Sequence, residues 1–93
     1  MALQPPVIIP SATATTTSGS TPISLLQNGI PARQFYIQNN GSVDMQFSFD
    51  GTNFLTLKAG LAIGVSDALM KQFFVKTASS TTTYEAMVVS HDL

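Results

Sequence analysis

The stretch from Phe35 to Gly60 constrains the fold most strongly, because apolar and polar side chains alternate along its centre. The apolar residues are Val43, Met45, Phe47 and Phe49, and the polar ones are Asp44, Gln46 and Ser48. This alternation predicts a β-strand with one buried face. Asn39-Asn40-Gly41 before the strand and Asp50-Gly51 after it can close tight turns, because Asn, Asp and Gly tolerate positive φ. The stretch therefore predicts a three-stranded antiparallel meander.

Shorter apolar runs separated by turn signals predict further strands, over residues 23–26, 33–38, 61–65, 72–77 and 84–90. The run Phe73-Phe74-Val75 is apolar on both faces, which predicts a central strand or one covered by a partner. Ser66-Asp67 could cap one helical turn over residues 68–71, with a surface loop as the alternative. The pattern predicts an all-β fold, either a small antiparallel β-sandwich or a jelly-roll-like barrel, of about seven short strands.

Residues 1–21 are expected to form an extended N-terminal arm before a β-sandwich domain over residues 22–93. Prolines at positions 5, 6 and 10 oppose a helix, and a Thr/Ser-rich tract follows them. The arm has no charge, unlike most solvated disordered tails. We therefore expect it to dock on a neighbouring subunit, with residues 7–9 as an added strand. A first strand of the protein's own sheet and a floppy tail are the alternatives.

Charged residues are scarce, which limits the classes of partner. They make up 10% of the 93 residues, and the net charge is -1 at pH 7. This balance gives no electrostatic footprint for nucleic acid or anionic lipid. Soluble monomers usually depend on surface charge, so the sequence favours a subunit covered by partners. The predicted partner-binding residues are Leu3, Val7, Ile8, Ile9, Phe73 and Val89. Neither a secretory signal nor a membrane-spanning run is recognised.

No residue pattern points to catalysis. The chain has no Cys, and its single His, His91, lies near the C-terminus, a poor position for a metal site or a Ser-His-Asp triad. Asp50 and Asn53 supply too few oxygen ligands for a calcium loop. We therefore expect no enzymatic activity, no cofactor, no metal and no small-molecule substrate. Tyr36, Tyr84 and Phe54 could stack on a sugar, but aromatic residues in small β domains belong more often to the core.

Residues 37–60, together with Phe74-Val75-Lys76-Thr77-Ala78, resemble a pattern in small structural proteins of tailed bacteriophages. That pattern consists of I-x-N, a strand, a D-G hairpin, L-x-A-G and an aromatic-Val-Lys-Thr strand. The resemblance covers about residues 35–89 and leaves out the arm. It implies a sandwich fold and a structural role as a capsid cement or decoration protein, or as a head-fibre or tail adaptor. It supplies no catalytic residues.

The expected function is that of a capsid decoration subunit, which braces junctions between capsid subunits through its arm and a sheet surface. The expected partners are the major capsid protein and copies of the chain itself. The expected location is the capsid surface of a virion assembled in the host cytoplasm. A neck, tail or fibre-attachment component is the alternative within the virion, and a carbohydrate-binding module is the alternative from another class. The sequence leaves open the oligomeric state and which sheet face is covered.

Overall fold

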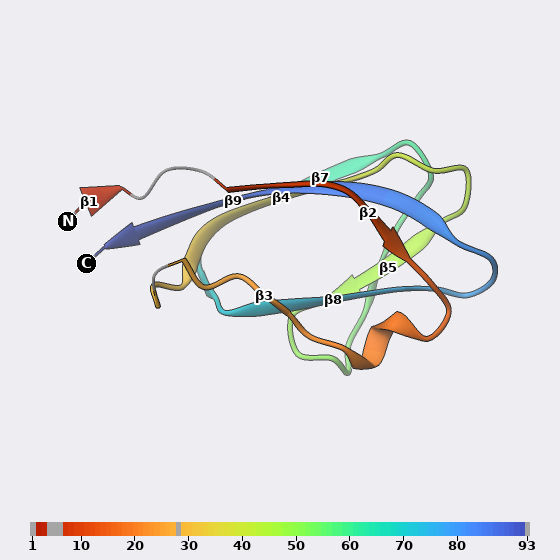
Figure 1. Ribbon diagram of the computed structural model, residues 1–93, viewed down its shortest axis with the longest axis horizontal. Helices are drawn as coiled ribbons and strands as arrows, with labels where there is room; N and C mark the ends of the chain where they lie inside the picture. Colours follow the sequence, from red (N-terminus) through yellow and green to blue (C-terminus); the bar gives the residue numbers. More distant parts are fainter. Residues whose placement is uncertain (1, 4–6, 28, 93) are drawn as a thin grey trace.

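A computed structural model, which describes residues 2–3, 7–27 and 29–92, shows two antiparallel sheets packed face to face (Figure 1). One sheet has the order β2-β9-β4-β7, with β1 also paired to β9, and the other has the order β3-β8-β5-β6. The predicted all-β sandwich is confirmed. The elements are β1 (Ala2–Leu3), β2 (Val7–Ala14), the 3-10 turn η1 (Ser18–Ser20), β3 (Ile23–Ser24), β4 (Ala32–Asn39), β5 (Met45–Ser48), β6 (Leu55–Leu57), β7 (Ala62–Met70), β8 (Gln72–Thr77) and β9 (Thr82–Asp92).

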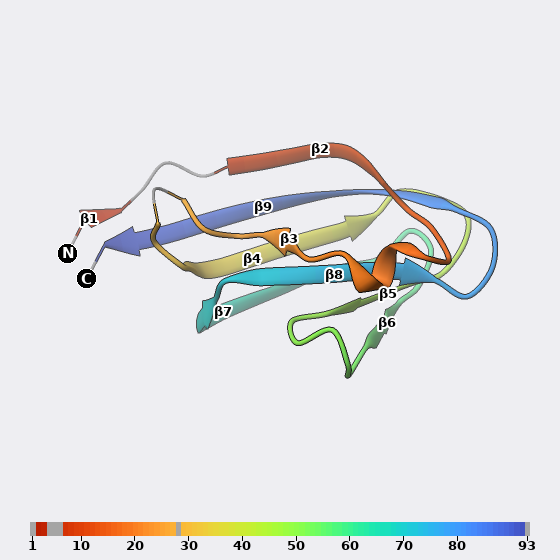
Figure 2. The same cartoon turned by 60° about the horizontal axis from the view of Figure 1, so that its bottom comes forward.

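The strand order is that of a jelly roll. Strands β2 to β9 divide into two four-stranded sheets, and most connections cross from one sheet to the other. Eight strands ordered in this way form two Greek keys. Strand β1 pairs with the end of β9, Ala2 with Asp92, so these two segments lie together at one end of the sandwich (Figure 2). The jelly-roll form of the predicted fold is therefore the one that the chain adopts.

The predicted meander is right in its second hairpin and wrong in its first. Strands β5 and β6 pair around the turn at Asp50-Gly51, as expected. Strand β4, however, pairs with β7 and β9 rather than with β5. The chain crosses to the opposite sheet after Asn39, which is completely buried instead of lying in an exposed turn.

The Asn39 side chain fixes this crossover through four hydrogen bonds. Its Nδ2 donates to the carbonyl oxygens of Val43, at 2.9 Å, and Leu57, at 3.0 Å. Its Oδ1 accepts from the Gly41 amide, at 3.1 Å, and from Thr82 Oγ1, at 2.8 Å. These bonds use the full hydrogen-bonding capacity of an amide side chain. They join the end of β4, the crossover, the end of β6 and the start of β9.

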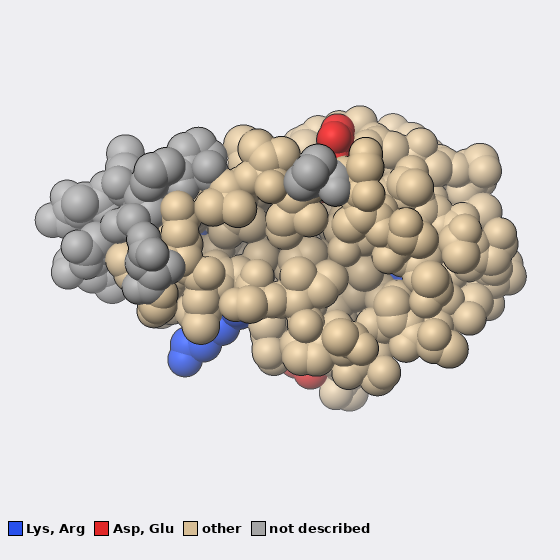
Figure 3. Space-filling view, in the orientation of Figure 1, with Lys and Arg blue, Asp and Glu red and all other residues tan. Residues whose placement is uncertain are grey.

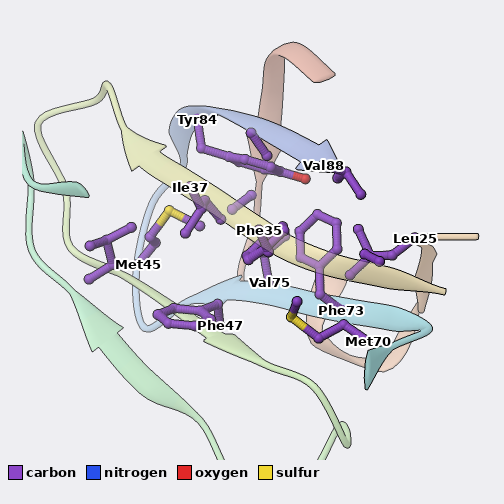
Figure 4. Close-up of a cluster of buried hydrophobic side chains, with 14 residues drawn as sticks. Leu25, Phe35, Ile37, Met45, Phe47, Met70, Phe73, Val75, Tyr84 and Val88 are labelled. Carbon is purple, nitrogen blue, oxygen red and sulfur yellow. The ribbon is translucent and has the colours of Figure 1, made fainter. Parts of the chain in front are cut away.

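Apolar side chains from both sheets fill the space between them (Figure 4). Phe73 of β8 is fully buried, with its ring centroid 5.0 Å from that of Phe35 on β4 and 6.3 Å from that of Tyr84 on β9. Strand β8, which contains the apolar run, is thus a central strand, one of the two alternatives that the sequence predicted. The expectation that Phe73 binds a partner is wrong, because the other sheet of its own chain covers it.

The N-terminal segment forms a strand of the protein's own sheet, which was the alternative to docking on a neighbour. Strand β2 pairs along β9, and its residues Ile9 and Ala12 pack against the core. Beyond β2, Ser18 Oγ donates to the Val75 carbonyl oxygen of β8 at 2.7 Å. Pairing within one chain needs no association with a second molecule, and the inward residues of β2 meet an apolar surface. Residues 7–21 therefore belong to the sandwich rather than to a separate arm.

The predicted helical turn over residues 68–71 is also wrong. Strand β7 continues to Met70, and its register against β4 shifts between the Gln34–Ser66 and Ala32–Met70 pairs. The extra residues of β7 form an irregularity in which Asp67 has a φ of 59°, a conformation that Asp tolerates better than most residues. No helix within the described residues is long and apolar enough to cross a membrane.

The turn between β5 and β6 is organised by the Asp50 carboxylate. The backbone amides of Asn53 and Thr52 donate to Oδ1, each at 2.8 Å, and Asn53 Nδ2 donates to Oδ2 at the same distance. Ser48 Oγ also donates to Oδ1. These bonds, led by that of the Asn53 amide, hold the pKa of Asp50 well below its usual range. The carboxylate thus closes a hairpin turn, and no group of three or more His, Cys, Asp or Glu residues gathers among the described residues.

Replacing Asn39 with Leu should destabilise the fold by about 2–4 kcal/mol, because several buried polar groups lose their partner at once. Urea unfolding at pH 7 measures this loss. Asn40→Ala is the matched control at the exposed neighbouring position and should change the free energy of unfolding by less than about 0.5 kcal/mol. Equal losses in the two variants would contradict the role assigned to Asn39.

The Asp50 turn should make stability depend on pH at the acid end. Because the pKa of Asp50 is lower in the folded state, its contribution is complete above the unfolded-state pKa, near pH 4, and is lost as the pH falls through the folded-state value. Urea unfolding at a series of pH values below about 4 measures the slope. Asp50→Asn should have a flatter profile than the wild type in this range, and an unchanged profile would contradict the assignment.

Candidate interaction surface

The surface of the β2-β9-β4-β7 sheet that faces away from the core is the strongest candidate for a functional site. We call it the outer face. Directly paired residues of an antiparallel sheet share one face, so the strand registers define its members. They are Ile8, Thr13, Gln34, Tyr36, Gln38, Ala62, Gly64, Ser66, Thr83, Glu85, Met87 and Val89. Glu85 is the only charged residue among them.

A row without charge crosses the outer face from one edge of the sheet to the other. Ile8 pairs with Met87, Met87 with Tyr36, and Tyr36 with Gly64. The exposed fractions are 59% for Ile8, 39% for Met87 and 37% for Tyr36. A sheet face that remains in water normally carries polar residues at such positions. The row therefore has the composition of a surface that another molecule covers.

The side chains that flank the apolar row on β4 are polar and uncharged. The Tyr36 hydroxyl donates to Gln38 Oε1 at 2.9 Å, and Gln38 Nε2 donates to Asn40 Oδ1 at 2.7 Å. These bonds form a chain along β4 and hold the side chains in place. An apolar centre with a polar rim and few charges is the usual composition of a protein–protein interface.

Two shallow grooves lie on the outer face, one on each side of Tyr36. The groove towards β7 has a volume of about 380 Å³ and is lined in part by Tyr36, Gly64 and Val89. The groove towards β2 has a volume of about 310 Å³, and Ile8 and Glu85 contribute to its lining. The first groove is open because Gly64 has no side chain. A Cβ atom at this position would approach only the Phe35 carbonyl oxygen, at 3.8 Å, so the fold itself does not require a glycine.

Charge is also scarce beyond the outer face. Figure 3 shows the side of the molecule over β2, β3 and η1, where uncharged residues make up nearly all of the visible surface. The low charge content of the sequence is thus visible on more than one side of the fold. This side of the molecule offers few charged side chains that could attract a highly charged partner.

The structure brings together only two of the predicted partner-binding residues, Ile8 and Val89, which both lie on the outer face. Val7 is 40% exposed but lies in the opposite orientation, beside Leu25 and Leu26 in a smaller hollow. Ile9 packs against the core. The side chain of Leu3 lies outside the described residues, and Phe73 belongs to the core.

Sequence reasoning did not select Tyr36, Gly64 and Met87 as partner-binding residues. The alternation along residues 33–38 and 84–90 places Tyr36 and Met87 on outward faces. It does not show that the two strands are neighbours, and no local pattern marks Gly64. The row becomes visible only once the registers of β4 with β7 and β9 are known.

The aromatic residues considered for sugar stacking do not form one platform. Tyr84 is only 2% exposed, and burial raises the pKa of its hydroxyl. Phe54 precedes β6 of the other sheet, where Lys76 Nζ lies 4.0 Å from the ring centroid. Only Tyr36 lies exposed on the outer face. The three-residue sugar site considered from the sequence is therefore wrong.

No protein-family model matches the sequence, and no curated protein matches it. Several solved structures have a similar fold. FeII HppE aligns with a TM-score of 0.57 and 10% identity, covering 89% of this chain and 41% of that protein. A protein of unknown function from Acinetobacter sp. ADP1 aligns with a TM-score of 0.53 and 13% identity, covering 82% of this chain and 64% of that one. This chain spans less than two thirds of either protein, and at such identities the likeness concerns the fold alone.

Adding a charge at Met87 and, in a second variant, at its neighbour Val88 should distinguish an outer-face position from a core position. Met87→Lys should change the free energy of unfolding by less than about 0.5 kcal/mol, because a lysine at this exposed position reaches water. Val88→Lys should cost more than about 3 kcal/mol, because Val88 is 3% exposed and its charge would have no partner. Urea unfolding of both variants measures the difference, and similar losses would contradict the assigned orientation of β9.

Proposed function

We propose that this chain is a structural subunit of a tailed-bacteriophage particle, of the capsid decoration type, and that its outer face is covered by protein in the particle. The observation that carries the proposal is the row Ile8–Met87–Tyr36–Gly64, which crosses a whole sheet without a charge. A free protein gains nothing from such a row, whereas an assembly subunit gains the hydrophobic free energy of covering it.

The fold and the sequence resemblance support this role in different ways. Jelly rolls occur in viral capsid proteins, and also in lectins and cupins, so the fold is compatible with the role without selecting it. The resemblance to small phage structural proteins covers about residues 35–89. Within this segment, β4, β7 and β9 supply all of the outer face except Ile8, Thr13 and Gln34.

Attachment through the outer face replaces the attachment through an arm that the sequence suggested. Strand β2 is held in its own sheet by β9, so it contributes Ile8 to the surface instead of reaching a neighbour. Full burial of a large apolar side chain contributes about 1.5–3 kcal/mol, so the partly exposed row offers several kcal/mol per copy. Because the surface carries one charge, attachment should depend little on salt concentration.

Decoration of the shell and attachment at a neck, tail or fibre differ in copy number. A decoration subunit recurs over the whole capsid surface, whereas a neck or tail component occupies one ring or one attachment point. Quantitative mass spectrometry of purified particles therefore separates the two roles.

Incorporation into particles tests the proposal. Met87→Lys puts a charge into the apolar row, and Thr56→Lys puts the same charge at an exposed position of β6, in the other sheet. Wild type and Thr56→Lys should bind to particles that lack the protein, whereas Met87→Lys should bind at least about 100-fold more weakly, since an unpaired charge would be buried.

Two results would contradict the proposal in different ways. If the wild-type chain does not associate with particles at all, the virion role is wrong. If Met87→Lys binds as well as the wild type, the outer face is not the attachment surface. Glycan binding by the wild type that disappears in Tyr36→Ala would favour a carbohydrate-binding module instead.

A further inference from the structure

The geometry points to a second copy of this chain as the molecule that covers the outer face. We infer a two-fold interface in which Ile8 of each copy fills the hollow over Gly64 of the other. This inference rests on the proposed function because it concerns the same surface: the second copy covers the outer face of the free protein, and attachment to a particle exchanges this contact for one with the shell. It is argued from the order of side chains along the apolar row.

The order of the row makes the face complementary to itself. Its four positions lie on adjacent strands about 4.8 Å apart, so the row is about 14 Å long. Rotation by 180° about an axis that lies between the two faces, parallel to the strands and through the centre of the row, reverses this order. Ile8 then faces Gly64 of the second copy, and Met87 faces Tyr36. Each contact occurs twice, as a two-fold interface requires.

This arrangement places large side chains against small ones. Ile8 is the most exposed of the three large side chains in the row, at 59%, and the groove beside Gly64 has a volume of about 380 Å³, enough for an aliphatic side chain. Met87 meets the Tyr36 ring, a contact that methionine sulfur favours. An axis parallel to the row instead would place Gly64 against Gly64 and Ile8 against Ile8. The first pair would leave a void, and the second would hold the faces apart.

The position of Glu85, the single charge of the face, also fits a two-fold axis parallel to the strands. Glu85 pairs with Gln38 within the sheet, so the rotation places Glu85 of one copy opposite Gln38 of the other. Gln38 Nε2 donates one hydrogen to Asn40 and has a second one for the carboxylate. The two Glu85 side chains are kept apart, and like-charge repulsion across the interface is avoided.

The free edge of β2 is a poorer place for self-association than the outer face. Pro10 lies within β2 and has no amide hydrogen to donate to an added strand. The register of β2 against β9 shifts between Ile9 and Ala12, and Ser11 has a φ of 33°. A proline and a bulge are typical means by which proteins prevent pairing at a sheet edge. Pairing of faces, with the strands of the two sheets nearly aligned, avoids both obstacles.

The size of the face indicates a dimer of moderate affinity. Four strands at about 4.8 Å and eight residues at about 3.3 Å give a face of roughly 500 Å² per copy. Two copies would bury roughly 1,000 Å², near the lower limit for specific protein interfaces. We therefore expect dissociation in the micromolar range, where the monomer and the dimer can both be measured.

Sedimentation velocity of the full chain at concentrations from about 1 to about 200 µM tests the inference. The wild type should change from monomer to dimer over this range. Gly64→Leu fills the hollow on both copies and should raise the dissociation constant at least about 100-fold. Its circular dichroism and thermal unfolding should remain those of the wild type, because a Cβ at Gly64 has room.

A matched pair of truncations tests the contact from the other side. Ile8→Ala and Leu55→Ala remove aliphatic carbon from positions that are 59% and 61% exposed, and Leu55 lies on β6 of the other sheet. Ile8→Ala should raise the dissociation constant about 10-fold, and Leu55→Ala should leave it unchanged. Combining Ile8→Ala with Gly64→Val should give a tighter dimer than Gly64→Val alone, because the smaller side chain at position 8 leaves space for the valine of the other copy.

A wild-type chain that stays monomeric up to the highest concentration would overturn the inference. A dimer that is insensitive to both Gly64→Leu and Ile8→Ala would overturn it as well, because the interface would then lie elsewhere. These results do not decide whether the chain is a virion subunit. A monomer that still binds particles through its outer face would keep the proposed function and remove the second copy. A dimer that has the expected sensitivity but never associates with particles would keep the second copy and remove the virion role.

Discussion

The fold depends on one buried amide, that of Asn39, because it fixes the point at which the chain changes sheets. Its four hydrogen bonds reach the crossover, the end of β6 and the start of β9. Gly41 must be a glycine for the same reason, since a Cβ atom there would overlap Thr82 Oγ1. With this junction in place, β4 lies between β9 and β7, and its outward residues become the middle of the outer face.

Strands β4 and β9 carry core residues on one side and outer-face residues on the other. Along β9, Tyr84, Ala86 and Val88 point inward, and Met87 between them points outward. Phe73 meets the aromatic rings of β4 and β9 from the opposite sheet and keeps those strands fixed. The packed core thus supports the outer face from behind. A preorganised surface loses little conformational entropy on binding, which favours association even when the buried area is small.

The sequence predicted those parts of the structure that local periodicity encodes. The buried side of β5 at Met45 and Phe47, the turn at Asp50-Gly51 and the fully apolar run of β8 were predicted correctly from neighbouring residues. Ser48, expected on the polar face of β5, is buried instead. The crossover at Asn39 was not, because Asn and Gly favour a turn whether or not the next strand returns to the same sheet. The sequence left the own-sheet position of β2 open as an alternative, since an uncharged β-branched segment can pair with any available edge. The apolar row requires registers between distant strands, which no local pattern contains.

The position of the two chain ends has a mechanical consequence. Strands β1 and β2 run along β9, and Ala2 and Asp92 pair at one tip, opposite the Asn39 junction. A force that separates the ends would load the hydrogen bonds between these strands one after another, starting from the tip. Such a geometry peels open at low force, whereas strands pulled from opposite ends resist together. The sandwich should therefore tolerate a load carried across its sheets far better than tension applied through its termini.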